Sequence, residues 1–437
     1  MTVCLLYVIV EVCFCRVLKI TITQEVDLAN ILLISHYFGC TGAPASLLRH
    51  AVYLKNAGHN VDVWSLGGGV LIEQYQKAGF SPIIIQKDYY HIEKAWHNSK
   101  KKYDLIVCNT TDTYQCVEVL SKKNVPLVWF IRETALVDEY MQTNKAFAKC
   151  FSTYYNLYTV SNYAVKTICK YNKNVRVINN SVADTFKEFA QFQKNLRFGY
   201  IGSIIPIKGV DVLLKAFSKV LDEGFDVSLT LAGGIGDYAR NLQAMYQKYP
   251  QMKWLGEVHA ADKEKFFDAI DVLVVPSIDE PGALTLLEGC MKGKIVITTK
   301  NVGSNYVVAD QKSGFIVQTN DENALSDAIK ALIKKNKDEL RTMQELSRKR
   351  YLQYGQPQRE REGVLKMLAD NISNPPKTRY VLPYFLLQTK NLAQKLFYER
   401  NENKRKYCFF GIPLISFKKE HIRICGIKIH LKRKKSK

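Results

Sequence analysis

Short apolar strands alternate with helical stretches along most of this chain, and this alternation constrains the fold more than any other feature. In the first half the expected strands are ILLIS (31–35), VDVWSL (61–66), SPIIIQ (81–86), YDLIVCN (103–109), PLVWFI (126–131), LYTVS (157–161) and VRVINN (175–180). Strands that alternate with helices form a parallel, doubly wound sheet, because each helix returns the chain across a face of the sheet.

The same alternation restarts after a polar stretch near residues 186–195. The later strands are LRFGYIGS (196–203), VSLTLAGG (227–234), MKWLGEV (252–258), DVLVVPSI (271–278) and KIVITT (294–299). A chain of 437 residues exceeds what one core usually supports. We therefore predict an α/β protein with two Rossmann-like domains that face a central cleft. Their expected bounds are 29–190 and 191–356, and a terminal helix is expected at 357–372.

The two ends of the chain differ from this body. Residues 377–437 hold 17 of the 62 Lys and Arg but only three acids, and so supply most of the net charge of +21. We interpret 373–437 as a basic amphipathic tail, whose residues 380–400 predict a helix that lies on an anionic membrane. A solubilising tail and an RNA-binding tail are the alternatives.

Two segments of the tail resemble each other, and each predicts a strand followed by a basic patch: FFGIPLISFKK (409–419) and ICGIKIHLKRKK (424–435). At the other end, residues 1–28 form an apolar leader of uncertain role. Its run at 3–15 is shorter than the ~20 residues that a spanning helix needs. We interpret it as strand-like or loosely apposed to a membrane; an upstream start site that is not used is the alternative.

Eleven cysteines are scattered along the chain without the paired spacing of a zinc site. This usage indicates reduced thiols in a cytoplasmic protein, and we expect no metal site.

The segment IDEPGALTLLEGCMKG (278–293) carries two carboxylates in an informative place. Glu280 follows a strand, and Glu288 lies on the next helix, which Gly293 ends. Carboxylates accept hydrogen bonds from sugar hydroxyls, and the N–H groups at a helix start can bind phosphate or sugar oxygens. Two acids at this spacing are, taken alone, most often a loop acid and a solvated helix acid, so their context decides.

Two further loops follow strands. In GYIGSIIPIKGVDVLLKAF (199–217), Gly202 allows close backbone approach and Lys208 can neutralise a diphosphate at a helix start. A lone loop Lys is usually only solvated. In SHYFGCTGAP (35–44), Gly39 and Gly42 keep the loop slim, and His36 is as readily structural as functional.

Together these segments resemble the retaining GT-B glycosyltransferases of family 4, the glycosyl transferases group 1, of the surface-polysaccharide type. The resemblance covers roughly residues 30 to 370. It implies that Glu280 contacts the donor sugar and supports the developing charge, while Glu288 binds the ribose. The family often has Phe-Gly where this chain has Gly282-Ala283, so the backbone contacts of Gly282, Ala283 and Leu284 to the donor are expected to differ.

Three other positions bear on the resemblance. Lys208 matches the phosphate-binding Lys of the family, but Ser203 replaces its Arg, so the phosphate clamp is weaker or another cation completes it. In WFIRE (129–133), Arg132 stands where many relatives have His. Any catalytic role of that His is therefore either taken over by Arg132 or absent from this chain. The resemblance also implies that Arg132 and Glu133 lie near the acceptor. It implies the same for the loop that contains His36.

A miniature dinucleotide fingerprint, G-x-G-x-x-A, occurs in LTLAGGIGDYA (229–239). It falls in the middle of the second half, so we interpret Gly234 as part of a loop that lines the nucleotide pocket rather than as an NAD site.

The expected function is transfer of a hexosyl group from a UDP- or GDP-linked sugar to a saccharide or lipid-linked acceptor, with retention and without metal or cofactor. The expected setting is cell-surface polysaccharide biosynthesis at the cytoplasmic face of the membrane, as a peripheral protein with no specific nucleic-acid partner. A non-catalytic sugar-nucleotide-binding scaffold is the alternative. A phosphorylase would carry a pyridoxal phosphate lysine, which the sequence does not reveal.

Overall fold

The structure is a computed structural model that describes residues 28–39, 41–154, 156–234, 236–258 and 260–373, together with five short strands of the tail. The expected leader therefore lies outside the described residues except for Leu28. The chain divides into two compact units: residues 1–150 and 155–378 form the larger one, and residues 151–154 and 379–437 form the other.

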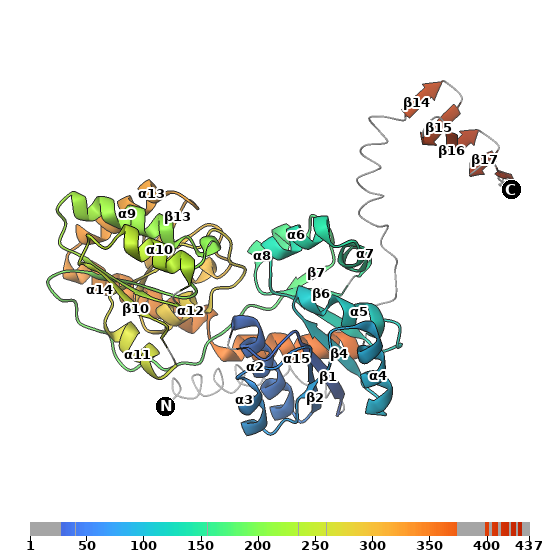
Figure 1. Cartoon of the computed structure of the whole chain (residues 1–437), viewed down its shortest axis with the longest axis horizontal. Helices are drawn as coiled ribbons and strands as arrows, with labels where there is room; N and C mark the ends of the chain where they lie inside the picture. Colours follow the sequence, from blue (N-terminus) through green and yellow to red (C-terminus); the bar gives the residue numbers. More distant parts are fainter. Residues whose placement is uncertain are drawn as a thin grey trace, which may run out of the picture. The chain divides into compact units, whose positions relative to one another are not determined.

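The first part of the larger unit is a seven-stranded parallel sheet in the order β3-β2-β1-β4-β5-β6-β7 (Figure 1). Its strands are β1 (Asn30–Ser35), β2 (Asn60–Ser65), β3 (Ile83–Ile84), β4 (Leu105–Asn109), β5 (Leu127–Ile131), β6 (Leu157–Thr159) and β7 (Val175–Val177). The helices between them are α2 (Gly42–Asn56), α3 (Ile72–Lys77), α4 (Tyr89–Ser99), α5 (Tyr114–Leu120), α6 (Ala135–Thr143), α7 (Lys145–Thr153) and α8 (Asn162–Ile168). We call this part the first lobe.

A second parallel sheet of six strands follows in the order β10-β9-β8-β11-β12-β13. Its strands are β8 (Arg197–Ile201), β9 (Ser228–Ala232), β10 (Met252–Gly256), β11 (Val272–Val275), β12 (Ile295–Thr299) and β13 (Gly314–Val317). Its helices are α9 (Val210–Asp222), α10 (Asp237–Met245), α11 (Ala260–Asp268), α12 (Leu284–Met291), α13 (Glu322–Ile333) and α14 (Lys337–Tyr354). We call this part the second lobe.

The predicted α/β architecture of two doubly wound sheets is confirmed. Both sheets reverse their strand order next to the first strand, between β1 and β4 and between β8 and β11. Loops that leave two such neighbouring strands diverge to opposite faces, which opens a crevice at their carboxyl ends. β13 was absent from the predicted strands. β3 is shorter than predicted, because Pro82 precedes it and cannot donate to a sheet ladder.

The last helix of the larger unit, α15 (Pro357–Ser373), packs on the first lobe although it comes after the second lobe in the chain. Figure 1 shows it in orange beside α2. Its residue Glu360 is 1% exposed and accepts hydrogen bonds from Arg49 (Nε–Oε2, 3.0 Å; Nη2–Oε1, 3.1 Å) and contacts His50 (Nε2–Oε1, 3.2 Å). Although burial alone would raise the pKa of Glu360, its contacts with Arg49 and His50 hold that pKa well below its usual range.

The tail contributes a five-stranded antiparallel sheet in the order β14-β15-β16-β17-β18. The strands are β14 (Tyr398–Asn401), β15 (Lys404–Phe409), β16 (Ile412–Lys418), β17 (His421–Ile424) and β18 (Ile427–His430). β16 and β18 fall in the two similar segments. The helix expected over 380–400 is wrong at its end, because β14 begins at Tyr398, and its other residues lie outside those described. Among the helices of the described residues, none is long and apolar enough to cross a bilayer.

Glu360→Gln should destabilise the protein by about 3 kcal/mol at pH 7, because the substitution leaves the guanidinium of Arg49 without its buried carboxylate. Urea unfolding measures this loss. The folded-state pKa of Glu360 is depressed, so its contribution is present above the unfolded value near 4.5 and is lost as the pH falls.

The matched control is Glu362→Gln, two residues along the same helix, where the side chain is exposed. It should change the free energy of unfolding by less than about 0.5 kcal/mol. Equal effects of the two substitutions would show that the contacts of Glu360 contribute nothing to the stability of the protein.

Candidate active site

Two residues that the sequence singled out meet at the carboxyl edge of the second sheet. Lys208 ends a short 3-10 turn, η2 (Pro206–Lys208), in the loop between β8 and α9, and Glu280 lies in the loop between β11 and α12. β8 and β11 are neighbours in the sheet, so the loops after them begin side by side at the crevice where the strand order reverses. The Nζ of Lys208 forms an ion pair with Oε2 of Glu280, and both side chains are partly buried. The sequence placed both residues at this edge without predicting this direct pair.

A glycine lets the Lys208 loop come this close. Gly209 has φ +64°, and a Cβ there would stand 2.3 Å from the carbonyl oxygen of Pro276 at the end of β11. Any other residue would therefore be strained and would push the loop away. The N–H of Ile278 donates to the carbonyl of Ile207 across the same gap (2.9 Å). The position of Lys208 is thus fixed by the backbone.

The backbone of Glu280 is held from the other side. Its N–H donates to the carbonyl of Asn301 (3.1 Å), and its carbonyl accepts from the N–H of Gly303 (2.7 Å). Both partners lie in the loop after β12, the next strand of the sheet. Glu280 therefore sits in a loop with a defined backbone, which is what a positioned functional group requires.

Glu288 lies on α12, in its second turn, and Ala283 and Leu284 form the start of that helix. Its Oε1 accepts from the Nζ of Lys263 on α11 (2.6 Å). Its Oε2 is buried and accepts no hydrogen bond from the described residues. A buried oxygen of this kind is ready to accept a hydrogen bond from a ligand. Sequence reasoning missed Lys263, because one lysine on a polar helix carries no signal.

The glycine loops after β8 and β9 pack on each other. A Cβ on Gly233 would stand 2.2 Å from the carbonyl oxygen of Gly202, whose N–H donates to Ala232 (3.0 Å). The side chain of Ser203 is exposed, so the position that carries Arg in the resembled family supplies no cation. Gly234 is exposed, with open space around it. These residues share the edge that carries Lys208.

In the first lobe, Arg132 lies directly after β5. Its Nε donates to Oδ1 of Asn109 (2.6 Å), its Nη1 donates to Oδ1 of Asn180 (3.1 Å), and its Cζ lies 4.3 Å from the centre of the Phe130 ring. Its Nη2 is buried and has no partner among the described residues. Burial lowers the pKa of Arg132 to about 10, so the side chain is still charged at neutral pH. It is a buried cation bonded to neutral amides.

Glu133 points back into the first lobe. Its Oε2 accepts from the backbone N–H groups of Thr111 and Arg132, each at 3.1 Å. Burial raises its pKa to about 7, against the lowering effect of these two hydrogen bonds.

The loop after β1 holds the three remaining predicted residues. Burial lowers the pKa of His36 to about 4, so its ring is neutral at physiological pH. Gly39 lies against Tyr37. A Cβ on Gly39 would stand only 1.9 Å from Cε2 of the Tyr37 ring. Gly42 begins α2, and a Cβ there would stand 3.6 Å from Cδ1 of Leu284 in the second lobe. This loop therefore reaches the start of α12.

The two lobes also touch through Gly282. The Nδ2 of Asn180 donates to its carbonyl (3.3 Å), and a Cβ at this position would stand 2.7 Å from Asn180 and 2.9 Å from Val160. Gly282 therefore permits a close approach of the first lobe to the loop of Glu280. Asn180 was missed by sequence reasoning, because its role depends on a partner more than 100 residues away.

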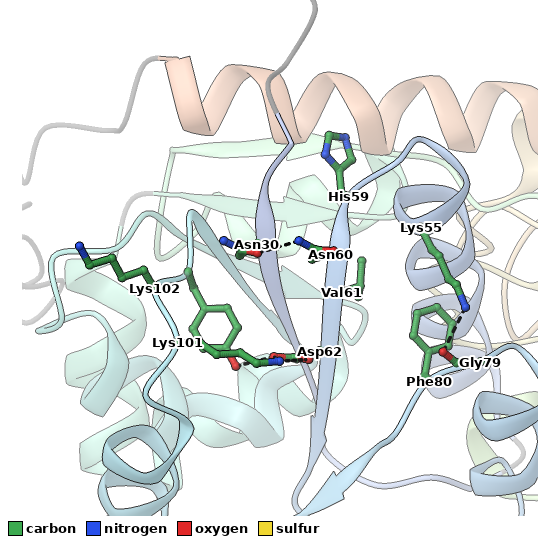
Figure 2. Close-up of a pocket in the computed structure, with 11 residues that line it drawn as sticks. Asn30, Lys55, His59, Asn60, Val61, Asp62, Gly79, Phe80, Lys101 and Lys102 are labelled. Carbon is green, nitrogen blue, oxygen red and sulfur yellow. Dashed lines mark hydrogen bonds and ion pairs between the residues drawn. The ribbon is translucent and has the colours of Figure 1, made fainter.

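A pocket of about 490 Å³ lies at the opposite edge of the first sheet (Figure 2). It is lined by residues at the amino ends of β1 and β2 and just before β4, including Asn30, Asn60 and Lys101. Its acid Asp62 already accepts hydrogen bonds from Lys101 and Tyr103. None of the predicted site residues lines this pocket, so it is separate from them.

Two family models match the chain. The model "Glycosyl-transferase family 4" matches residues 29–193, and "Glycosyl transferases group 1" matches residues 182–350. Among curated proteins, the capsular polysaccharide biosynthesis glycosyltransferase CapM of Staphylococcus aureus is 26% identical over 156 residues, which is 36% of this chain and 40% of CapM. The match thus spans less than half the length of this curated relative.

Solved structures resemble the chain over a larger part. A glycosyltransferase of Rickettsia africae has a TM-score of 0.63 at 18% identity, covering 80% of this chain and 100% of that chain. Anabaena HepE, solved in complex with UDP and glucose, has a TM-score of 0.68 at 17% identity, covering 78% of this chain and 100% of that chain. At these identities the likeness concerns the fold.

The free energy of unfolding of the Glu133→Gln variant, relative to that of the unsubstituted protein, should increase as the pH rises from about 4.5 to 8. The folded-state pKa of Glu133 is raised to about 7, so the protein loses stability as this group ionises, whereas Gln stays neutral. The difference should reach at most ~3 kcal/mol, at ~1.4 kcal/mol per pKa unit. Thermal unfolding at several pH values measures it.

Glu139→Gln on the exposed face of α6 is the control and should show no such slope. A pH-independent difference for Glu133→Gln would mean that its carboxyl group is not buried as described.

Proposed function

Because residues 29–350 belong to the glycosyltransferases of the GT-B fold, we propose that the chain transfers a hexosyl group from a UDP- or GDP-linked sugar to a saccharide or lipid-linked acceptor, with retention at the anomeric carbon. The bond from the anomeric carbon to the diphosphate breaks, a bond to the acceptor oxygen forms, and the proton of the acceptor hydroxyl passes to the leaving diphosphate. Cell-surface polysaccharide biosynthesis is the proposed setting.

The observation that carries this proposal is the ion pair of Lys208 and Glu280 at the carboxyl edge of the second sheet, with Glu288 on the helix that follows the Glu280 loop. A lysine at the start of α9 can neutralise a diphosphate as it leaves, and preorganised charge of this kind often contributes more to catalysis than any other single effect. Glu280 would orient the donor sugar, and the free Oε2 of Glu288 would accept a hydrogen bond from the ribose. Lys208 and the helix start would thus act without a metal or a cofactor.

The pairing of Lys208 with Glu280 has a mechanistic meaning in the proposed reaction. A donor brings two phosphate charges, which compete with Glu280 for the same ammonium group. When Lys208 moves to the diphosphate, Glu280 is released to accept hydrogen bonds from the sugar hydroxyls. Lys263 would instead stay on Oε1 of Glu288 and hold the carboxylate while its Oε2 accepts from the ribose.

The first lobe would supply the acceptor side. Arg132 keeps its charge without a carboxylate partner among its hydrogen bonds, so it can stabilise negative charge near the reacting centre. His36 is neutral and can accept or donate a hydrogen bond, and Glu133 is proposed to shape the same region rather than to contact the donor. Gly39 and Gly42 leave room for the acceptor.

Names of similar proteins support the donor and the setting. CapM is named for capsular polysaccharide biosynthesis, and HepE was solved with UDP and glucose. We further propose that the basic tail holds the protein at the cytoplasmic face of the cell membrane, since 17 Lys and Arg against three acids favour an anionic lipid surface.

Glu280→Gln should lower kcat by about 100-fold, the size seen when one preorganised stabilising group is lost. Its Kd for UDP or GDP should stay equal or become tighter, because the substitution frees Lys208. Lys208→Met should instead weaken nucleoside diphosphate binding and lower kcat together. Release of nucleotide from a panel of UDP- and GDP-sugars, with calorimetric titration, measures both.

Glu345→Gln on α14 serves as the control, because this acid is exposed and pairs only within its own helix. Turnover that survives Glu280→Gln would remove the assignment of Glu280. Tight donor binding by the unsubstituted protein without any turnover would favour the non-catalytic scaffold.

A chain ending at residue 376 should lose flotation with vesicles that contain anionic lipid, because it lacks the 17 cations of the tail. Its hydrolysis of the donor should stay within about twofold of the full chain. Binding of the full chain should also weaken as salt rises. Unchanged flotation of the shortened chain would place the membrane contact elsewhere.

A further inference from the structure

The residue before Glu280 makes contacts that neither the proposed donor site nor the local fold explains. Oδ1 of Asp279 accepts from the hydroxyl of Thr134 (2.6 Å) and from that of Tyr163 (2.7 Å). Its Oδ2 accepts from the backbone N–H of Ala135 (2.9 Å). Asp279 belongs to the second lobe, whereas all three donors belong to the first.

These contacts complete the start of α6. Thr134 precedes that helix, but its hydroxyl does not cap its own helix. The carboxylate of Asp279 takes the N–H of Ala135 in its place. A negative charge at a helix N-terminus is favourable, because the first N–H groups have no partners within the helix and carry the positive end of its dipole. The N-terminus of α6 in the first lobe is thus capped by a carboxylate from the second lobe.

The neighbours of Asp279 continue the same pattern. Ser161 donates to the carbonyl of Pro281 (2.6 Å), and Asn180 donates to that of Gly282 (3.3 Å). Glu280 lies between Asp279 and Pro281 in the chain, and its backbone forms hydrogen bonds with Asn301 and Gly303 of its own lobe. Residues 279, 281 and 282 are therefore held by the first lobe, while residue 280 is held by the second.

From this arrangement we propose that Asp279 is a positioning residue for the transfer reaction. Its contacts with Thr134, Ala135 and Tyr163 lock the Glu280 loop in its working position only when the first lobe is docked. The proposal rests on the proposed function for its effect on turnover. It adds that donor binding and assembly of the catalytic loop are separate steps. The donor binds residues of the second lobe, and docking of the first lobe then fixes Glu280.

Thr134→Val is the sharpest test, because it removes one hydroxyl and keeps the shape of the side chain. Hydrogen bonds to charged groups are the stronger class, so we expect kcat to fall about 10-fold in Thr134→Val and about 10- to 100-fold in Asp279→Asn. Thr134→Ser keeps the hydroxyl and should retain kcat within about twofold. The Kd for UDP or GDP should stay within about twofold in all three variants.

Hydrogen exchange of the full-length chain gives a second readout that does not require turnover. Peptides covering residues 133–143 and 276–284 should exchange faster together in Thr134→Val and in Tyr163→Phe, while α14 stays unchanged. Thr143→Val, at the exposed far end of α6, is the matched control and should alter neither peptide.

The double variant Thr134→Val with Asp279→Asn should lower kcat by less than the product of the two single effects, because both changes act on the Thr134–Asp279 contact. The proposal is overturned if Thr134→Val and Tyr163→Phe keep normal kcat and normal exchange. It is also overturned if nucleotide binding falls as much as kcat. If the unsubstituted chain turns over no sugar nucleotide, the proposed function fails, and the exchange data still decide the inter-lobe contact.

Discussion

The larger unit depends on one buried carboxylate. Glu360 reaches the first lobe from the helix that comes after the second lobe, and Arg49 binds it with two nitrogens. Arg49 also donates to the hydroxyl of Ser46 (2.6 Å), which lies 3.2 Å from Oδ1 of Asn180, and Asn180 donates to the carbonyl of Gly282. A continuous set of polar contacts therefore runs from the terminal helix to the loop that carries the main candidate residue. Packing of α15 and placement of that loop are parts of one network.

Sequence reasoning reached the fold and the edge of the site, because both arise from local patterns. Apolar strands that alternate with helices specify doubly wound sheets, and parallel strands bring the residues after them, such as Lys208 and Glu280, to one edge. It did not reach the contacts across that edge. Asp279 is an ordinary loop acid by composition, and its hydroxyl partners lie 145 and 116 residues away. The helix predicted in the tail extends too far, because β14 begins at Tyr398. A short apolar run is compatible with a strand as well as with a helix.

The departures from the resembled family have physical consequences in this chain. Arg132 is a permanent cation where a histidine would titrate, and Asn109 and Asn180 hold it without neutralising it. The exposed Ser203 leaves Lys208 as the cation of the loop after β8. Positive charge near the predicted site is thus divided between the lobes, with Arg132 in the first and Lys208 in the second. Both positive charges can act on one bound ligand only when the two lobes are together.

The pairing of Lys208 with Glu280 also affects how the product leaves. In the proposed reaction, Glu280 would have no hydroxyl to hold once the sugar has been transferred, and its carboxylate would again be available to the ammonium group of Lys208. Glu280 would then compete with the spent diphosphate for that ammonium group. This exchange would speed departure of the nucleoside diphosphate and limit product inhibition. The ion pair would therefore weaken donor binding but favour repeated turnover.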